Sequence, residues 1–175
     1  MIKMILTTSA LVGTFGLGLA TSTFLNDVNP SVPSTSEVVE IPVEVYKPRW
    51  TLPGGTPEEQ YVLKKLQENT KITDRNALAT ILGNIKQESN FRPDVCEGGA
   101  RVPYDACTRG GYGLIQWTSV NRYNNLGKFC ENFGCDPSSL EGQTRYMINE
   151  STFQRYLPEF EGRGKTISQY MVPAF

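Results

Sequence analysis

Residues 74–93 read DRNALATILGNIKQESNFRP, and the rest of the predicted fold is arranged around this stretch. Asp74 is suited to cap a helix, because its carboxylate accepts hydrogen bonds from free backbone N–H groups of the first turn. Apolar residues then recur at helical spacing, at Ala77, Leu78, Ile81, Leu82 and Ile85. Pro93 disfavours helical backbone at the residue before it. The stretch therefore predicts an amphipathic helix that starts after Asp74 and ends before Pro93.

Three further helices are predicted in the same C-terminal region. Residues 56–59, Thr-Pro-Glu-Glu, form a capping box with proline at the first helical position, and this helix runs to about Asn69. A helix follows Thr118, and another begins near Ser138 or Ser139. The glycine- and cysteine-rich residues 94–113 predict a loop or a small hairpin, and the tail beyond Gly162 has no clear periodicity. The expected fold class is mainly α with a small β-hairpin.

The composition excludes several classes of function. The 175 residues include 17 Lys and Arg against 18 Asp and Glu, and this near balance argues against a nucleic-acid partner. The chain contains no histidine, which excludes Ser-His-Asp and Cys-His nucleophiles and any metal site with imidazole ligands. Chemistry must therefore depend on carboxylates, hydroxyls, thiols or amines. We expect neither a metal nor an organic cofactor.

The N-terminal third has the composition of targeting and linker segments. Residues 1–22 combine an early Lys3 with an uncharged run at residues 4–20, which predicts a cleaved signal peptide or, alternatively, a retained membrane anchor. Six of the eleven prolines fall within residues 30–57, so residues 23–55 are interpreted as an extended linker. The folded domain is predicted at residues 56–175. We expect it to be exported or membrane-anchored.

Four cysteines stand at positions 96, 107, 130 and 135, and none forms a Cys-x-x-Cys pair. An even number behind a signal-like segment favours two disulfides, and the alternative is four reduced thiols. Three pairings are possible. Closure of the shortest loops favours Cys96–Cys107 and Cys130–Cys135, each contributing about 2–3 kcal/mol.

Glu88 is the candidate catalytic residue. It follows Ile81 and Ile85 at helical spacing, which aligns its carboxyl group with the buried stripe. Burial and the negative end of the helix dipole would both favour the neutral form, which a general acid needs. The alternative is a surface glutamate at a helix end, paired with Arg75, Lys86 or Arg92.

The order Glu88-Ser89-Asn90-Phe91-Arg92-Pro93, then Gly113-Leu114-Ile115-Gln116, resembles a pattern of the lysozyme-like superfamily, especially of lytic transglycosylases. Residues 81–85 and 110–117, together with Arg122, resemble the phage tail lysozyme family more closely. Gln143, Tyr146 and Glu150 also fit that family. The resemblance covers roughly residues 56–155 and implies a lysozyme-like α+β domain.

The resemblance also implies roles for individual residues. It implies a muramidase that cuts the β-1,4 bond between N-acetylmuramic acid and N-acetylglucosamine in peptidoglycan, with Glu88 protonating the glycosidic oxygen. Gln116 would bind the sugar and Ser89 would support Glu88. The aromatic candidates for packing on sugar faces are Tyr112, Trp117 and Tyr146, although Trp117 is equally suited to anchor the core.

Several alternatives stay open at this point. Hydrolysis by two carboxylates needs a partner for Glu88, and Asp94, Glu97 and Asp105 are candidates, whereas a transglycosylase needs a single glutamate. The domain is expected to act in a phage endolysin or in the virion, where tail proteins would be further partners. A different class of function is a non-catalytic peptidoglycan-binding or tail structural module.

Overall fold

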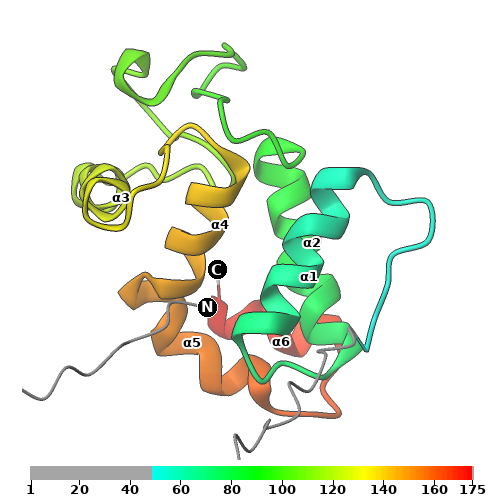
Figure 1. Ribbon diagram of the computed structural model, residues 1–175. Coiled ribbons are helices and arrows are strands. Elements are labelled where there is room, and N and C mark those ends of the chain that lie inside the picture. The colour runs from blue at the N-terminus through cyan, green and yellow to red at the C-terminus, as the bar shows by residue number, and fades with distance from the viewer. Residues whose placement is uncertain (1–48, 175) are drawn as a thin grey trace, which may run out of the picture. The chain divides into compact units, whose positions relative to one another are not determined.

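The computed structural model describes residues 49–174, and these residues form six α-helices and one short 3-10 turn (Figure 1). In chain order these are α1 (Pro57–Asn69), α2 (Arg75–Ser89), η1 (Tyr104–Ala106), α3 (Val120–Phe133), α4 (Leu140–Asn149), α5 (Ser151–Glu161) and α6 (Ile167–Ala174). The predicted signal or anchor at residues 1–22 lies outside the described residues, as does most of the predicted linker.

The predicted caps form as expected. The hydroxyl of Thr56 accepts a hydrogen bond from the Glu59 N–H, and the Glu59 carboxylate accepts one from the Thr56 N–H. At the start of α2, the Asp74 carboxylate accepts a hydrogen bond from the Asn76 N–H at 2.7 Å. The helix ends at Ser89, because Asn90 adopts a left-handed conformation with φ 53°. The extent of the central helix predicted from residues 74–93 is thus confirmed.

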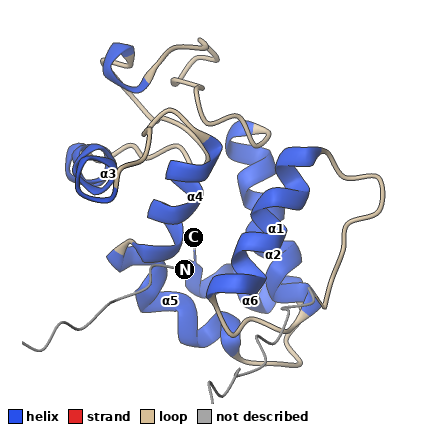
Figure 2. Ribbon diagram, in the orientation of Figure 1, coloured by secondary structure: helices blue, strands red, loops and turns tan. Residues whose placement is uncertain are grey.

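The predicted β-hairpin is absent from the part of the chain that the structure describes, and Figure 2 shows helices and loops there without strands. Residues 94–113 contain two isolated antiparallel bridges, Val95 with Arg101 and Cys96 with Tyr112. Val95 and Cys96 thus pair with two different segments, so neither contact extends into a ladder. The expectation of a hairpin is corrected to a looped segment.

The core lies between α1, α2, α4 and the C-terminal helices. Contacts join α1 to α2 and α4, while α2 also contacts α5 and α6 (Figure 1). Fully buried side chains from distant parts of the sequence meet there, including Leu66, Ile85, Leu114, Met147 and Tyr170. Helix α6 closes the core beneath α2 although the sequence gives no periodic signal for it.

The folded part begins before the predicted boundary at residue 56. The backbone of Trp50 exchanges two hydrogen bonds with the Gln67 side chain of α1, at 2.8 and 2.9 Å. The Trp50 indole N–H also donates to the Thr73 carbonyl at 2.9 Å. The last residues assigned to the linker therefore pack against the domain. Across residues 49–174, no helix has the length and apolar character needed to span a membrane.

Both predicted disulfides are present. Cys96 is bonded to Cys107, with their Cα atoms 5.6 Å apart, and Cys130 is bonded to Cys135, with Cα atoms 4.4 Å apart. The first fastens the looped segment after α2, and the second fastens the end of α3.

Candidate active site

Glu88 lies in the last turn of α2 and lines a cleft of about 730 Å³, including its open mouth. The cleft has a mostly apolar lining with a few polar side chains, and it is lined by Ile81, Asn84, Ile85, Glu88, Ile115, Arg122, Met147, Glu150, Thr152, Phe153, Tyr156 and Phe160. Helix α2 and the segments of α3, α4 and α5 thus contribute to one depression.

The Glu88 side chain is exposed at this cleft, and it makes no hydrogen bond or ion pair with any described residue. The expectation that it is desolvated is therefore corrected. Glu88 extends the stripe of Ile81 and Ile85 by one turn, to the place where α2 leaves the core. The alternative, an ion pair with Arg75, Lys86 or Arg92, does not form among the residues described, and Lys86 pairs with Glu59 instead. The carboxyl group is thus free to meet a ligand.

Arg122 and Glu150 form an ion pair in the same cleft. The Arg122 Nε and Nη2 atoms donate to the two Glu150 oxygens at 3.0 and 2.6 Å, and the Trp117 indole N–H donates to Glu150 Oε2 at 3.3 Å. The Glu150 side chain is 4% exposed and that of Arg122 is 34% exposed. The cleft therefore combines one paired, buried carboxylate with one unpaired, exposed carboxylate.

Ser89 joins the end of α2 to the loop at residues 113–116. Its hydroxyl has one proton, shared between the Leu114 carbonyl at 2.9 Å and the Ile85 carbonyl at 3.2 Å. The expectation that Ser89 supports Glu88 by a hydrogen bond is therefore corrected. The Leu114 N–H donates to the Gln143 amide oxygen at 2.8 Å. The backbone N–H and the backbone carbonyl of Leu114 are therefore both fixed, the carbonyl by α2 and the N–H by α4.

Gln143 connects three chain segments and is completely buried. Besides accepting from Leu114, its amide nitrogen donates to the carbonyls of Pro93 and Pro137 at 2.6 and 2.7 Å. This amide fixes the segment after α2, the loop that contributes Ile115 to the cleft, and the segment before α4. Its position places Gln143 behind the cleft wall as a support.

Backbone strain concentrates in the two segments that Ser89 connects. Asn90, Phe91 and Gln116 are the non-glycine residues with positive φ within residues 49–174, at 53°, 60° and 48°. Such conformations cost about 1–3 kcal/mol each and persist where the surroundings fix them. Strain of this kind is typical of functional sites, and here Asn90 and Phe91 stand two and three positions after Glu88.

The family described as phage tail lysozyme matches residues 58–170, which is more than half of the chain. The chain belongs to the phage tail lysozyme family. This membership confirms the resemblance carried by residues 81–93 and 110–117, and it gives the chain a lysozyme-like, peptidoglycan-cleaving role. Neither a curated protein nor a solved structure matches the chain.

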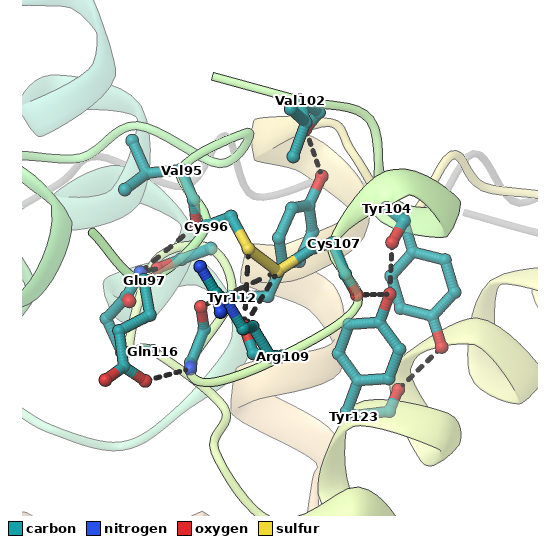
Figure 3. Close-up of a disulfide and its surroundings, with 12 residues drawn as sticks. Val95, Cys96, Glu97, Val102, Tyr104, Cys107, Arg109, Tyr112, Gln116 and Tyr123 are labelled. Atoms are coloured by element: carbon teal, nitrogen blue, oxygen red, sulfur yellow. Dashed lines mark hydrogen bonds between the residues drawn. A yellow bond between two sulfur atoms is a disulfide. The ribbon is translucent and has the colours of Figure 1, made fainter. Parts of the chain in front are cut away.

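The three aromatic residues expected at the sugar lie in the core of this phage tail lysozyme domain. Tyr112 and Trp117 are fully buried and Tyr146 is 5% exposed. The Tyr112 hydroxyl donates to the Val102 carbonyl at 3.2 Å (Figure 3), and the Tyr146 hydroxyl donates to the Arg122 carbonyl at 2.9 Å. Burial raises the pKa of Tyr146 to about 12. The expectation of stacking on sugar is corrected, because these rings support the loop and Arg122 from behind.

Gln116 lies beside the Cys96–Cys107 disulfide (Figure 3), and its amide is directed back to its own loop. The amide nitrogen donates to the carbonyls of Gly113 at 2.9 Å and Val95 at 3.2 Å. The neighbouring Ile115 lines the cleft, whereas Gln116 is not among its lining residues. The lysozyme domain therefore uses Gln116 to shape the loop, which corrects its expected contact with sugar.

The expected partner carboxylates of Glu88 lie elsewhere. Asp94 is paired with Arg101 at 2.5 Å, and Glu97 accepts a hydrogen bond from the Gly111 N–H at 2.9 Å. Asp105 belongs to η1, and none of the three lines the cleft. Sequence reasoning missed Asn84, Thr152 and the Arg122–Glu150 pair as cleft residues. The sequence signal for Arg122 and Glu150 was their place in the family pattern.

The described part of this lysozyme domain contains no cluster of three or more acidic or cysteine side chains suited to hold a metal ion. Its cysteines are all engaged in disulfides within that part of the chain. The cleft presents one carboxyl group without a partner among the described residues, one guanidinium fixed by Glu150, and a mostly apolar lining.

Proposed function

We propose that the domain is a muramidase that cuts the β-1,4 bond between N-acetylmuramic acid and N-acetylglucosamine, with Glu88 as general acid. The observation that carries this proposal is the position of Glu88, an unpaired carboxyl group at a cleft in a member of the phage tail lysozyme family. The apolar side chains of the lining suit the faces of sugar rings, and its polar side chains suit their hydroxyl and acetamido groups.

The reaction begins when the Glu88 carboxyl group donates its proton to the glycosidic oxygen. The bond between that oxygen and the anomeric carbon of N-acetylmuramic acid breaks, and positive charge develops on the sugar. The Glu88 carboxylate can then take a proton from the attacking group, which reverses its first role. Water as the attacking group gives hydrolysis and a reducing end.

A second candidate, lytic transglycosylation, is favoured by one observation. Among the residues that line the cleft, the other carboxylate is Glu150, and it already accepts hydrogen bonds from Trp117 and Arg122. In hydrolysis by two carboxylates the second lies about 5–9.5 Å from the first and acts as nucleophile or base, a role for which the buried, ion-paired Glu150 is poorly suited. Attack by the 6-hydroxyl of the same sugar requires Glu88 alone and gives a 1,6-anhydro end.

Glu88→Gln tests the proposal. Gln has nearly the same shape but carries no acidic proton, so the rate of clearing of purified cell walls should fall by about 10²- to 10⁴-fold. Glu58→Gln is the matched control, because Glu58 is exposed in the first turn of α1, away from the cleft, and it should retain activity. Equal clearing by wild type and Glu88→Gln would contradict the role of Glu88.

Mass spectrometry of the released glycans distinguishes the outcomes. Reducing ends indicate hydrolysis, 1,6-anhydro ends indicate transglycosylation, and wall binding without cleavage indicates a non-catalytic module. We also propose that the domain acts outside the cytoplasmic membrane, from an exported phage endolysin or a virion tail, because peptidoglycan lies there. The signal-like residues 1–22 support the exported form.

A further inference from the structure

We propose that Arg122 is a substrate-binding residue that donates hydrogen bonds to oxygen atoms of the glycan strand, and that Glu150 is the positioning residue that holds it. The inference rests on the proposed function, because it assigns the cleft of Glu88 to a glycan. The observation behind it is that the Arg122 guanidinium lines that cleft while being fixed from the protein side.

Arg122 is fixed at both its backbone and its side chain. Its N–H donates to the Ser119 hydroxyl at 3.3 Å, and its carbonyl accepts from the Tyr146 hydroxyl at 2.9 Å. Its Nε and Nη2 atoms reach both oxygens of Glu150, which gives a two-point contact. Arginine loses considerable side-chain entropy when it is ordered. Here that loss occurs on folding, so a ligand meets a donor that is already in place.

Glu150 is oriented toward Arg122 at the expense of a local contact. It occupies the N-cap position of α5, where a side chain normally accepts hydrogen bonds from the first turn, but it makes no capping hydrogen bond. Its oxygens instead accept from Arg122 and Trp117 inside the protein. A buried ion pair is often no more stabilising than apolar residues of similar size. The role of this ion pair is therefore better explained by the orientation that Glu150 gives to Arg122 than by a gain in stability.

The guanidinium retains donors for a ligand. Nη1 of Arg122 has no acceptor among the described side chains and backbone, and the side chain is 34% exposed at the cleft. Arginine donates only, so its ligand must present acceptor oxygens. Glycan strands present them as hydroxyl, acetamido and ether oxygens. Glu88 lines the same cleft without pairing with Arg122, so both groups are available to one ligand.

The test measures glycan binding in an inactive parent. A soluble β-1,4-linked N-acetylglucosamine oligosaccharide is titrated into Glu88→Gln by calorimetry, and then into the same protein with Arg122→Gln, Arg122→Lys or Glu150→Gln added. Loss of a charged hydrogen bond should weaken binding about ten- to a hundredfold for Arg122→Gln. Lysine cannot reproduce the two-point contact and should recover only part of the affinity.

Arg145→Gln is the matched control, because Arg145 forms an exposed Arg–Glu pair with Glu141 on α4, outside the cleft. Its effect on affinity should be less than twofold. Glu150→Gln should weaken binding through Arg122, so the double change with Arg122→Gln should weaken it no further than Arg122→Gln alone. If the two changes acted independently through the structure, their losses of binding free energy would instead add in the double variant. The double change also leaves no unpaired buried charge, which preserves the test if the single variant folds poorly.

Kinetics on cell walls give the second measurement. In the otherwise wild-type enzyme, the double change at Arg122 and Glu150 should raise KM about tenfold or more with a smaller effect on kcat. Unchanged affinity and unchanged KM would overturn the role of Arg122 while leaving the proposed function intact. Two negative results together would overturn the proposed function as well as this inference. They are no binding of the oligosaccharide by Glu88→Gln and no clearing of cell walls by the wild-type enzyme.

Discussion

Gly113 shows how a single residue fixes the loop beside the cleft. Its φ is 74°, and a Cβ atom at this position would lie 2.2 Å from the Gln143 amide oxygen. That oxygen accepts the hydrogen bond from the Leu114 N–H, so the missing side chain allows the amide to reach the loop backbone. Glycine is required here by both its backbone conformation and the close approach.

We expect Gly113→Ala to lower the free energy of unfolding by about 3 kcal/mol, from backbone strain and overpacking together. It should also slow wall clearing, because Ile115 would shift at the cleft. Gly98→Ala is the control, since Gly98 has a φ of 89° but nothing within 4 Å of its Cβ position. It should cost about 1 kcal/mol. Similar losses in urea unfolding would contradict the proposed clash with Gln143.

The sequence predicted where the site lies better than it predicted which contacts its residues make. Glu88 could be placed near the end of a helix from the spacing of Ile81 and Ile85, and the structure places it at the cleft. The orientation of Tyr112 and Trp117 depends on packing with segments far away in the sequence, which local spacing does not encode. An aromatic residue suits a sugar and a core equally well, so composition alone could not decide between them.

At the scale of elements, the ion pair of Glu59 and Lys86 connects α1 with α2. Lys86 Nζ lies 2.8 Å from the Glu59 carboxylate, which also completes the capping box of α1. The hydrogen bonds from Lys86 and from the Thr56 backbone lower the pKa of Glu59 below 4.5. Because the folded pKa is lowered, this carboxylate stabilises the fold above pH 4.5, and that contribution is lost as the pH falls through the lowered pKa.

Glu59→Gln isolates the charge, since glutamine can still complete the capping box. We expect the variant to be less stable than wild type by about 1 kcal/mol at neutral pH, a modest value because the lysine is solvent-exposed. The difference should shrink as the pH falls below 4.5 and disappear once the pH lies below the lowered pKa of Glu59. Urea unfolding at several pH values measures it, with exposed Glu58→Gln as control. A constant difference at all pH values would argue against the charge.

The elements that were predicted are those with local signals. Helices α1 and α2 have side-chain caps at their N-termini and an apolar stripe, and both were placed correctly. Helix α5 has no side-chain cap and contains Pro158, so its sequence resembles an interrupted segment. The hairpin was wrong because glycines and cysteines at residues 94–113 indicate a chain reversal, whereas a ladder needs paired neighbours along both strands.

At the scale of the whole domain, the two disulfides are expected to contribute similar amounts to the free energy of unfolding. Cys96–Cys107 closes a separation of 11 residues and Cys130–Cys135 one of 5. Loop closure predicts a loss of about 3 kcal/mol for the first and about 2 kcal/mol for the second when each pair is replaced by alanine. By stability alone the two variants should be hard to tell apart.

Activity should separate them, because the first disulfide adjoins the backbone that holds the cleft loop. Residue 95, next to Cys96, accepts hydrogen bonds from the Gly113 N–H at 2.8 Å and from the Gln116 amide, while Cys130 and Cys135 lie at the end of α3, outside the cleft. Alanine at positions 96 and 107 should therefore reduce kcat/KM for wall clearing several-fold at a temperature where both variants are folded. Alanine at positions 130 and 135 should leave it unchanged. Equal activity in the two variants would mean that the loop keeps its position without the covalent link, and that Ser89 and Gln143 alone suffice to hold it.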